Sequence, residues 1–209
     1  MAGPSDDLAE QMRPEPRTGQ LVVVTVGTDH HQFNRLMDWV ERWLAHRDEP
    51  VRCVVQHGSS RTVSGTDGFA LLPPQEFRAL LSTADAVVTQ GGPGSIMDAR
   101  EAGRLPIVVP RLHALGEVVD DHQLAFARRL AANDLIRLAE SEDEFAALVD
   151  KALADPDEFR VATVEADDHG EAMVRRFADL VDELMLTGSK GESGTGAGFL
   201  RGLRRRRQP

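Results

Sequence analysis

Three glycines stand close together in the segment QGGPGS, where Gly91, Gly92 and Gly94 precede Ser95. Glycine lets the backbone approach a ligand, and the first amides of a following helix, together with its dipole, favour a phosphate group. The alternative is that the glycines only turn the chain while Ser95 and Asp98 form a capping box. The segment therefore predicts either a diphosphate site at the start of a helix or a tight turn.

A second segment, VGTDHH, places a carboxylate beside two imidazoles at Asp29, His30 and His31. In one interpretation Asp29 caps a helix and both histidines face solvent. In the other, His30 or His31 contacts a phosphate or lies near the reacting centre. Adjacent residues seldom both reach one ion, and no third ligand follows at a suggestive spacing. We therefore expect neither a metal nor another cofactor.

Two further polar segments contain candidate binding residues. The third segment, QHGSS, begins at Gln56 and is explained equally well by turn chemistry or by a binding loop. The fourth runs into a helical pattern, and its polar residues are Arg111, Glu117, Asp120, Asp121, His122 and Gln123. Asp120 or Asp121 could cap that helix and pair with Arg111, which would leave only a charged helix start. The density of polar groups favours a ligand site.

Strands and helices alternate between these segments. Apolar, β-branched runs predict strands at 21–26, 51–55, 86–89, 107–109 and 135–138. Helical periodicity predicts helices at 33–44, 75–81, 96–102, 121–132 and 142–154. This alternation is typical of a single doubly wound, Rossmann-like α/β domain with a parallel sheet. Ligands bind beyond the carboxyl ends of such strands, where all four polar segments fall.

The composition favours a soluble domain that binds a small ligand. The 209-residue chain has a formal net charge of −10, which disfavours nucleic acid, and no apolar run approaches the about 20 residues that span a bilayer. Its single cysteine, Cys53, lies in an apolar run and is interpreted as a buried structural thiol. We expect a disordered arm at 1–19, one domain at 20–186 and a flexible basic tail at 187–209. In that tail, Arg204–Arg207 are either solvated or in weak contact with anionic lipid.

Together these motifs resemble the C-terminal domain of glycosyltransferase family 28. The resemblance covers about residues 21 to 150 and depends on VTVGT at 24–28, GGPGSI at 91–96, PR at 110–111 and GExVDDHQ at 116–123. It implies the nucleotide-sugar-binding half of a GT-B glycosyltransferase. It extends to the small catalytic subunits of two-part transferases that act on lipid-linked sugars.

The resemblance also implies residue roles. In the family the glycine-rich turn faces the donor diphosphate, an acidic helix residue corresponding to Asp98 binds the ribose, and the fourth segment contacts the donor sugar or its phosphates. Stabilisation of the departing diphosphate would fall to His30, His31 or Arg111. The expected donor-binding residues are Gly27, Thr28, Gln56, Gly91, Gly92, Gly94, Ser95, Asp98, Glu117, Asp121, His122 and Gln123.

A complete GT-B enzyme has two such domains, and the acceptor-binding domain normally comes first. Only about twenty residues precede Leu21, so we expect that half to be a separate, membrane-anchored polypeptide. The implied reaction transfers a hexose or N-acetylhexosamine, with inversion, from a UDP-linked donor to a lipid-linked acceptor in polysaccharide synthesis. The subunit would lie in the cytoplasm at the inner face of the membrane, held there by its partner. Two alternatives stay open: a non-catalytic donor-binding or regulatory subunit, and a nucleotide-sugar epimerase.

Overall fold

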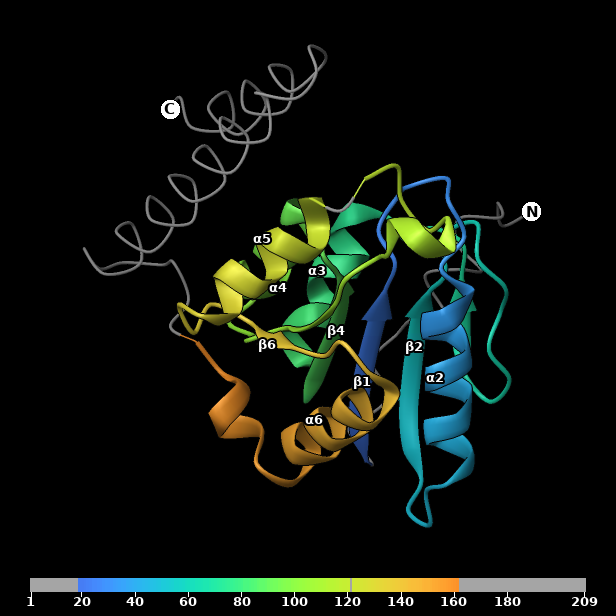
Figure 1. Ribbon diagram of the computed structural model, residues 1–209. Helices are drawn as coiled ribbons and strands as arrows, with labels where there is room; N and C mark the ends of the chain where they lie inside the picture. Colours follow the sequence, from blue (N-terminus) through green and yellow to red (C-terminus); the bar gives the residue numbers. More distant parts are fainter. Residues whose placement is uncertain (1–18, 121, 162–209) are drawn as a thin grey trace.

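A single parallel sheet forms the centre of the molecule (Figure 1). The computed structural model describes residues 19–120 and 122–161. Six strands lie in the order β3-β2-β1-β4-β5-β6, and every adjacent pair is parallel. Their bounds are β1 Gln20–Thr25, β2 Val51–Gln56, β3 Asp67–Phe69, β4 Ala86–Gln90, β5 Ile107–Val109 and β6 Arg137–Leu138. The strand order reverses between β1 and β4, which confirms the predicted doubly wound, Rossmann-like α/β fold.

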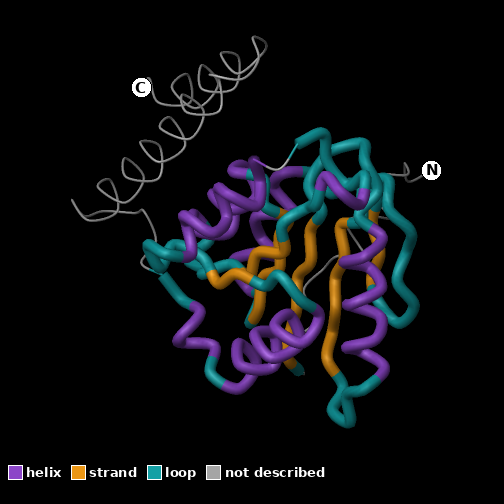
Figure 2. Tube along the Cα trace, in the orientation of Figure 1, coloured by secondary structure: helices purple, strands orange, loops and turns teal. Residues whose placement is uncertain are grey.

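Helices cover both faces of the sheet, as Figures 1 and 2 show. Helices α2 and α6 pack on one face, and α3, α4 and α5 pack on the other. The bounds are α2 Asn34–Ala45, α3 Pro74–Thr83, α4 Pro93–Glu101, α5 His122–Ala131 and α6 Glu142–Ala154, with short 3-10 helices η1 His113–Leu115 and η2 Pro156–Phe159. Side chains alternate along β1, so Val22 and Val24 join the core under α2 and α6, while Leu21 and Val23 join the core under α3.

Helix α4 begins earlier than its apolar pattern predicts. Its first residue is Pro93, with Gly92 as N-cap, because the fixed φ of proline suits the first helical position and its missing amide proton costs nothing there. Gly94 and Ser95 therefore lie inside the first turn of the helix. The alternative in which Ser95 and Asp98 form a capping box is wrong, since no side chain caps α4.

Several expectations fall on parts of the chain that lie outside the described residues. These parts are 1–18 and 162–209, so the domain limits and the two interpretations of Arg204–Arg207 stay predictions. Within the described ranges, no helix is long and apolar enough to cross a membrane. Cys53 is 2% exposed, as predicted, and burial raises the pKa of its thiol to about 12.

Candidate functional site

The loops that follow β1, β2, β4 and β5 meet at the carboxyl edge of the sheet. Two hydrogen bonds tie the first two loops together. Ser59 Oγ donates to the His30 carbonyl at 2.8 Å, and the Phe33 amide donates to Ser60 Oγ at 2.7 Å. The loop after β2 therefore holds the shape of the loop that carries the paired histidines.

Gln56, an expected donor-binding residue, is buried and uses its carboxamide inside the fold. Its Nε2 donates to Thr25 Oγ1 at 3.1 Å, and its Oε1 accepts from the Leu72 amide at 3.0 Å. Thr25 Oγ1 also accepts from the Gly27 amide at 3.1 Å. Gln56 thus supports the start of the β1–α2 loop through Thr25. A direct contact of Gln56 with the donor stays a prediction.

The side chain of Gln90 fills the space between the two glycine-bearing loops. Gly27 has a left-handed φ of +71°, and a Cβ atom there would collide with Gln90 Nε2. A Cβ on Gly92 would lie 2.6 Å from the same nitrogen. On the other side of the turn, a Cβ on Gly91 would lie 3.4 Å from Gln123. The glycines therefore bring the segments after β1, β4 and β5 together.

Three buried oxygens at this turn have no hydrogen-bond partner among the described residues: Thr89 Oγ1, Gln90 Oε1 and Gln123 Oε1. Buried polar atoms in folded proteins are nearly always paired with protein, water or ligand. A hydroxyl can donate or accept, and a carboxamide can turn either its oxygen or its nitrogen toward a ligand. Because α4 starts beside them, these groups and the first amides of the helix can together bind an oxygen-rich anion.

The β1–α2 loop carries the candidate histidines. The N-cap of α2 is Phe33 and no side chain caps the helix, so the alternative in which Asp29 caps α2 is wrong. Asp29 Oδ1 instead accepts from the His31 amide at 2.8 Å and lies 2.7 Å from His31 Nδ1. The His30 side chain is 87% exposed, and its ring centroid lies 4.0 Å from that of His31. Asp29 thereby orients His31, and the two imidazoles lie together at the edge of the sheet.

Burial favours the neutral form of Asp29, but hydrogen bonds from the His31 amide and ring outweigh it and hold the pKa of Asp29 below 3.8. Asp29 is therefore a carboxylate at neutral pH. One ligand atom from each of Asp29, His30 and His31 lies within 4.8 Å of the others, so this group of the described residues could hold a divalent cation. The His31 Nδ1 atom, however, is already engaged by Asp29.

Arg111 is fully buried and joins three backbone segments. Its Nη1 donates to the carbonyls of His31 at 2.8 Å and Glu117 at 3.0 Å, and its Nη2 donates to the carbonyl of Val26 at 3.0 Å. The guanidinium carbon lies 4.8 Å from the centroid of the Phe33 ring. These contacts make Arg111 a brace between the loops after β1 and β5, and its contact with a diphosphate stays a prediction.

Arg35, on helix α2, links that helix to the loop after β5. Its Nε and Nη2 atoms donate to the two carboxylate oxygens of Glu117 at 3.0 and 2.8 Å, and Nη2 also donates to the Pro110 carbonyl at 2.8 Å. The Leu112 amide adds a bond to Glu117 at 2.9 Å, and the Arg35 guanidinium lies 4.8 Å from the Trp39 ring centroid. Glu117, an expected donor-binding residue, is therefore held in a bidentate ion pair.

The remaining expected residues lie around this edge or outside the described residues. Thr28 is exposed on the β1–α2 loop, His122 is the exposed first residue of α5, and Asp98 is half-buried on α4. Asp120 Oδ1 accepts from the His122 amide at 3.0 Å, so Asp120 contacts the first residue of α5, and which residue caps that helix stays a prediction. Asp121 lies outside the described residues.

Three residues of the site, Thr89, Gln90 and Arg35, were not among the sequence-based candidates. Gln90 is part of the QGGPGS segment, and its position at the end of a strand was a usable signal. Arg35 offered no signal, because an arginine at a polar position of a helical pattern is ordinarily solvated. Its partner Glu117 is 82 positions further along the chain, so only the fold brings them together.

Comparison with solved structures places the fold among glycosyltransferases. The glycotransferase of kitacinnamycin is similar at a TM-score of 0.51 and 21% identity, over 83% of this chain and 41% of that protein. The calicheamicin glycosyltransferase CalG4 has a TM-score of 0.51 and 16% identity, over 82% of this chain and 40% of that protein. MurG of Acinetobacter baumannii has a TM-score of 0.51 and 15% identity, over 70% and 47%. The chain thus spans less than half the length of each of these proteins, and the likeness shows the fold alone.

The sequence comparisons identify the family. A search of the curated proteins finds no match to the chain. The family described as Glycosyltransferase family 28 C-terminal domain matches residues 21–181, which is most of the 209-residue chain. The match covers all six strands of the sheet except the first residue of β1. The chain belongs to the glycosyltransferase family 28 C-terminal domain family.

Proposed function

We propose that this chain is the donor-binding subunit of a glycosyltransferase that moves a hexose or N-acetylhexosamine from a UDP-linked donor to a lipid-linked acceptor in polysaccharide synthesis. The observation that carries the proposal is the turn after β4. There Gly91 and Gly92 directly precede the first residue of α4, and buried side-chain oxygens of Gln90 and Gln123 lack hydrogen-bond partners among the described residues. Family membership adds the expectation of a nucleotide-sugar donor.

The reaction places a defined demand on the protein. The acceptor hydroxyl oxygen bonds to the anomeric carbon from the side opposite the diphosphate, the bond from that carbon to the diphosphate oxygen breaks, and the hydroxyl proton passes to a base. The departing diphosphate keeps the electron pair, so negative charge grows on its oxygen. Donors fixed in advance at that position lower the barrier selectively.

We assign this role to the first amides of α4 and to His30 and His31. Asp29 holds His31 by two hydrogen bonds, and the tilted His30 ring lies at a centroid distance of 4.0 Å from the His31 ring, so both rings are held on the loop that contains Gly27. Arg111 contributes by fixing the His31 carbonyl and, in the sequence-based hypothesis, by facing the diphosphate itself. Asp98 on α4 is proposed to bind the ribose, and Gln123 the donor sugar.

The acceptor is proposed to come from a second, membrane-anchored subunit. The support for this proposal is the resemblance of the chain to the small subunits of two-part transferases that act on lipid-linked sugars. A subunit of this kind would work in the cytoplasm, at the inner face of the membrane, held by its partner.

Calorimetric titration with UDP tests the donor site. Gly92→Val would drive a side chain into the space of Gln90 Nε2, which lies 2.6 Å from a Cβ at that position, and should weaken UDP binding roughly tenfold or more. Gly68→Val is the matched control, because a Cβ there meets only the His57 ring at 3.7 Å and valine suits strand β3. Equal UDP affinities of both folded variants and the wild type would exclude the proposed donor site.

A non-catalytic donor-binding subunit is the second candidate, because the proposed site binds the donor and no base for the acceptor hydroxyl has been assigned among the described residues. The two candidates differ in turnover. The chain is mixed with its membrane partner, a lipid acceptor and UDP-sugars, and free UDP and the sugar product are measured by mass spectrometry. UDP release with transfer supports catalysis. Donor binding without release supports the non-catalytic role, and an isomer of unchanged donor mass would indicate an epimerase.

A further inference from the structure

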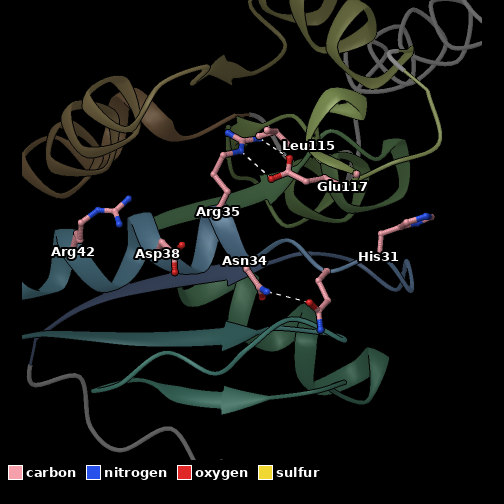
Figure 3. A pocket seen from close by; sticks show the side chains of 9 residues that line it. His31, Asn34, Arg35, Asp38, Arg42, Leu115 and Glu117 are labelled. Carbon is pink, nitrogen blue, oxygen red and sulfur yellow. Dashed lines mark hydrogen bonds and ion pairs between the residues drawn. The ribbon is translucent and has the colours of Figure 1, made fainter.

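A cavity of about 490 Å³ lies beside the histidine loop, between helix α2 and the turn at 113–117 (Figure 3). His31 forms one end of its lining, and Asp38 and Arg42 on α2 continue it away from the loop. Leu115 lines it from the turn. The volume is that of a small-molecule site. Apart from His31, Arg35 and Glu117, its lining has no part in the donor site described above.

The charged groups of this cavity are already neutralised by partners in the protein. Arg35 pairs with Glu117 at 2.8 Å, and both line the cavity. Arg42 pairs with Glu142 at 2.6 Å, and Asp38 pairs with Arg61 at 2.6 Å. An anionic ligand would therefore find no unpaired cation among these residues. The balance of charge favours a neutral, polar ligand.

The same ion pairs leave hydrogen-bonding atoms available. Arg61 uses only Oδ1 of Asp38, which leaves Oδ2 to accept, and Glu142 engages Nε and Nη2 of Arg42, which leaves Nη1 to donate. Gln32 accepts through Oε1 from Asn34, so its amide nitrogen is also available. Hydrogen bonds to such charged groups are about twice as strong as neutral ones. The cavity therefore offers both donors and acceptors, and sugar hydroxyls can bind either kind of group.

An apolar surface completes the cavity. Leu115 is 58% exposed although it is a large apolar side chain, and it lies opposite the polar side chains of α2. A pyranose ring has hydroxyls around its rim and C–H groups on its faces. Its C–H face can therefore pack on Leu115 while its hydroxyls bond to the charged groups of α2. A lipid chain has no hydrogen-bonding atoms and would leave those charged groups without further hydrogen bonds.

We infer that this cavity is a saccharide subsite that takes a neutral sugar of the acceptor and holds it beside the histidine loop. This inference rests on the proposed function and deepens it, because it assigns part of the acceptor contact to this chain instead of to the membrane partner alone. Asp38 and Arg42 hold the hydroxyls, Leu115 covers a ring face, and the Arg35–Glu117 pair keeps the turn at 113–117 in place.

The test uses the full chain labelled with ¹⁵N and titrated with cellobiose or lactose, with amide shifts as the readout. Saturable shifts are expected at residues 32–42 and 115–117. Leu115→Ser and Asp38→Asn should each weaken sugar binding roughly tenfold. The control Leu71→Ser should not, because Leu71 is 65% exposed and does not line the cavity. UDP affinity, measured on the same variants, should stay at the wild-type value.

Three results would overturn the inference: no saturable shift with either disaccharide, sugar binding that both cavity variants leave unchanged, or stronger shifts of the same amides with inorganic phosphate. The UDP titration separates the two proposals. If UDP binds and the sugars do not, the saccharide subsite alone is wrong. If UDP fails to bind as well, the proposed function is wrong with it.

Discussion

Replacing Arg111 tests whether this residue braces the site or contacts the ligand. Its guanidinium donates three hydrogen bonds, to the carbonyls of Val26, His31 and Glu117, and it is 0% exposed. In Arg111→Met an apolar stem remains but all three carbonyls lose their donor. Each hydrogen bond to a charged group contributes about 1.5–3 kcal/mol, and the sum is less than additive, so we expect a loss of about 3–5 kcal/mol in the free energy of unfolding.

Equilibrium unfolding in urea measures this loss. With a typical urea m-value of about 2 kcal/mol/M, the midpoint should fall by about 1.5–2.5 M. The urea midpoint of Arg111→Lys should lie between those of the wild type and Arg111→Met, since an ammonium group cannot span three carbonyls. The control Arg52→Met removes a pair with Asp67 in which the side chains are 44% and 49% exposed, and such exposed pairs contribute about 0–1 kcal/mol. If Arg111→Met unfolds within about 1 kcal/mol of the wild type but loses UDP affinity, the bracing argument is refuted and a direct ligand contact is favoured.

Three other predictions follow from particular contacts. Gly27→Ala should destabilise the β1–α2 loop and abolish UDP binding measured by calorimetry, because Gly27 has a φ of +71° and its Cβ would meet Gln90. Gly65→Ala controls for backbone strain alone, since Gly65 has a φ of +76° and a Cβ there would have no atom within 4 Å. Cys53 should react with a thiol reagent at pH 8 only after denaturation, since burial raises its pKa to about 12; rapid labelling of the native protein would contradict this. The Asp29 pKa is lowered from 3.8, so its stabilisation of the loop is complete above that pH and is lost as the pH falls through the folded-state pKa. The His31 amide resonance should titrate with a midpoint below 3.8, and Asp29→Asn should remove that step.

The sequence by itself determined the fold class and the edge of the sheet at which the site lies. Apolar runs such as Leu21–Val24 predict strands, and these runs alternate with helical patterns. Such alternation favours a parallel doubly wound sheet, because each helix can bury its apolar side against one face of the sheet. The predicted helix 142–154 agrees with α6 Glu142–Ala154, because Ser141 and Glu144 form a capping box that depends only on neighbouring residues. The glycine-rich segment is recognisable for the same reason, since its backbone requirements are local.

Only the tertiary structure decided how the candidate residues are used. Arg111 was expected to face a diphosphate, but whether a guanidinium points to solvent or to buried carbonyls depends on which loops pack around it. Gln56 uses its carboxamide on Thr25 and Leu72, which lie on other segments of the chain. The Arg35–Glu117 pair joins residues 82 positions apart. Local propensity determines strands, turns and caps, whereas pairing over such distances follows from the order of the strands in the sheet, which brings α2 beside the loop after β5.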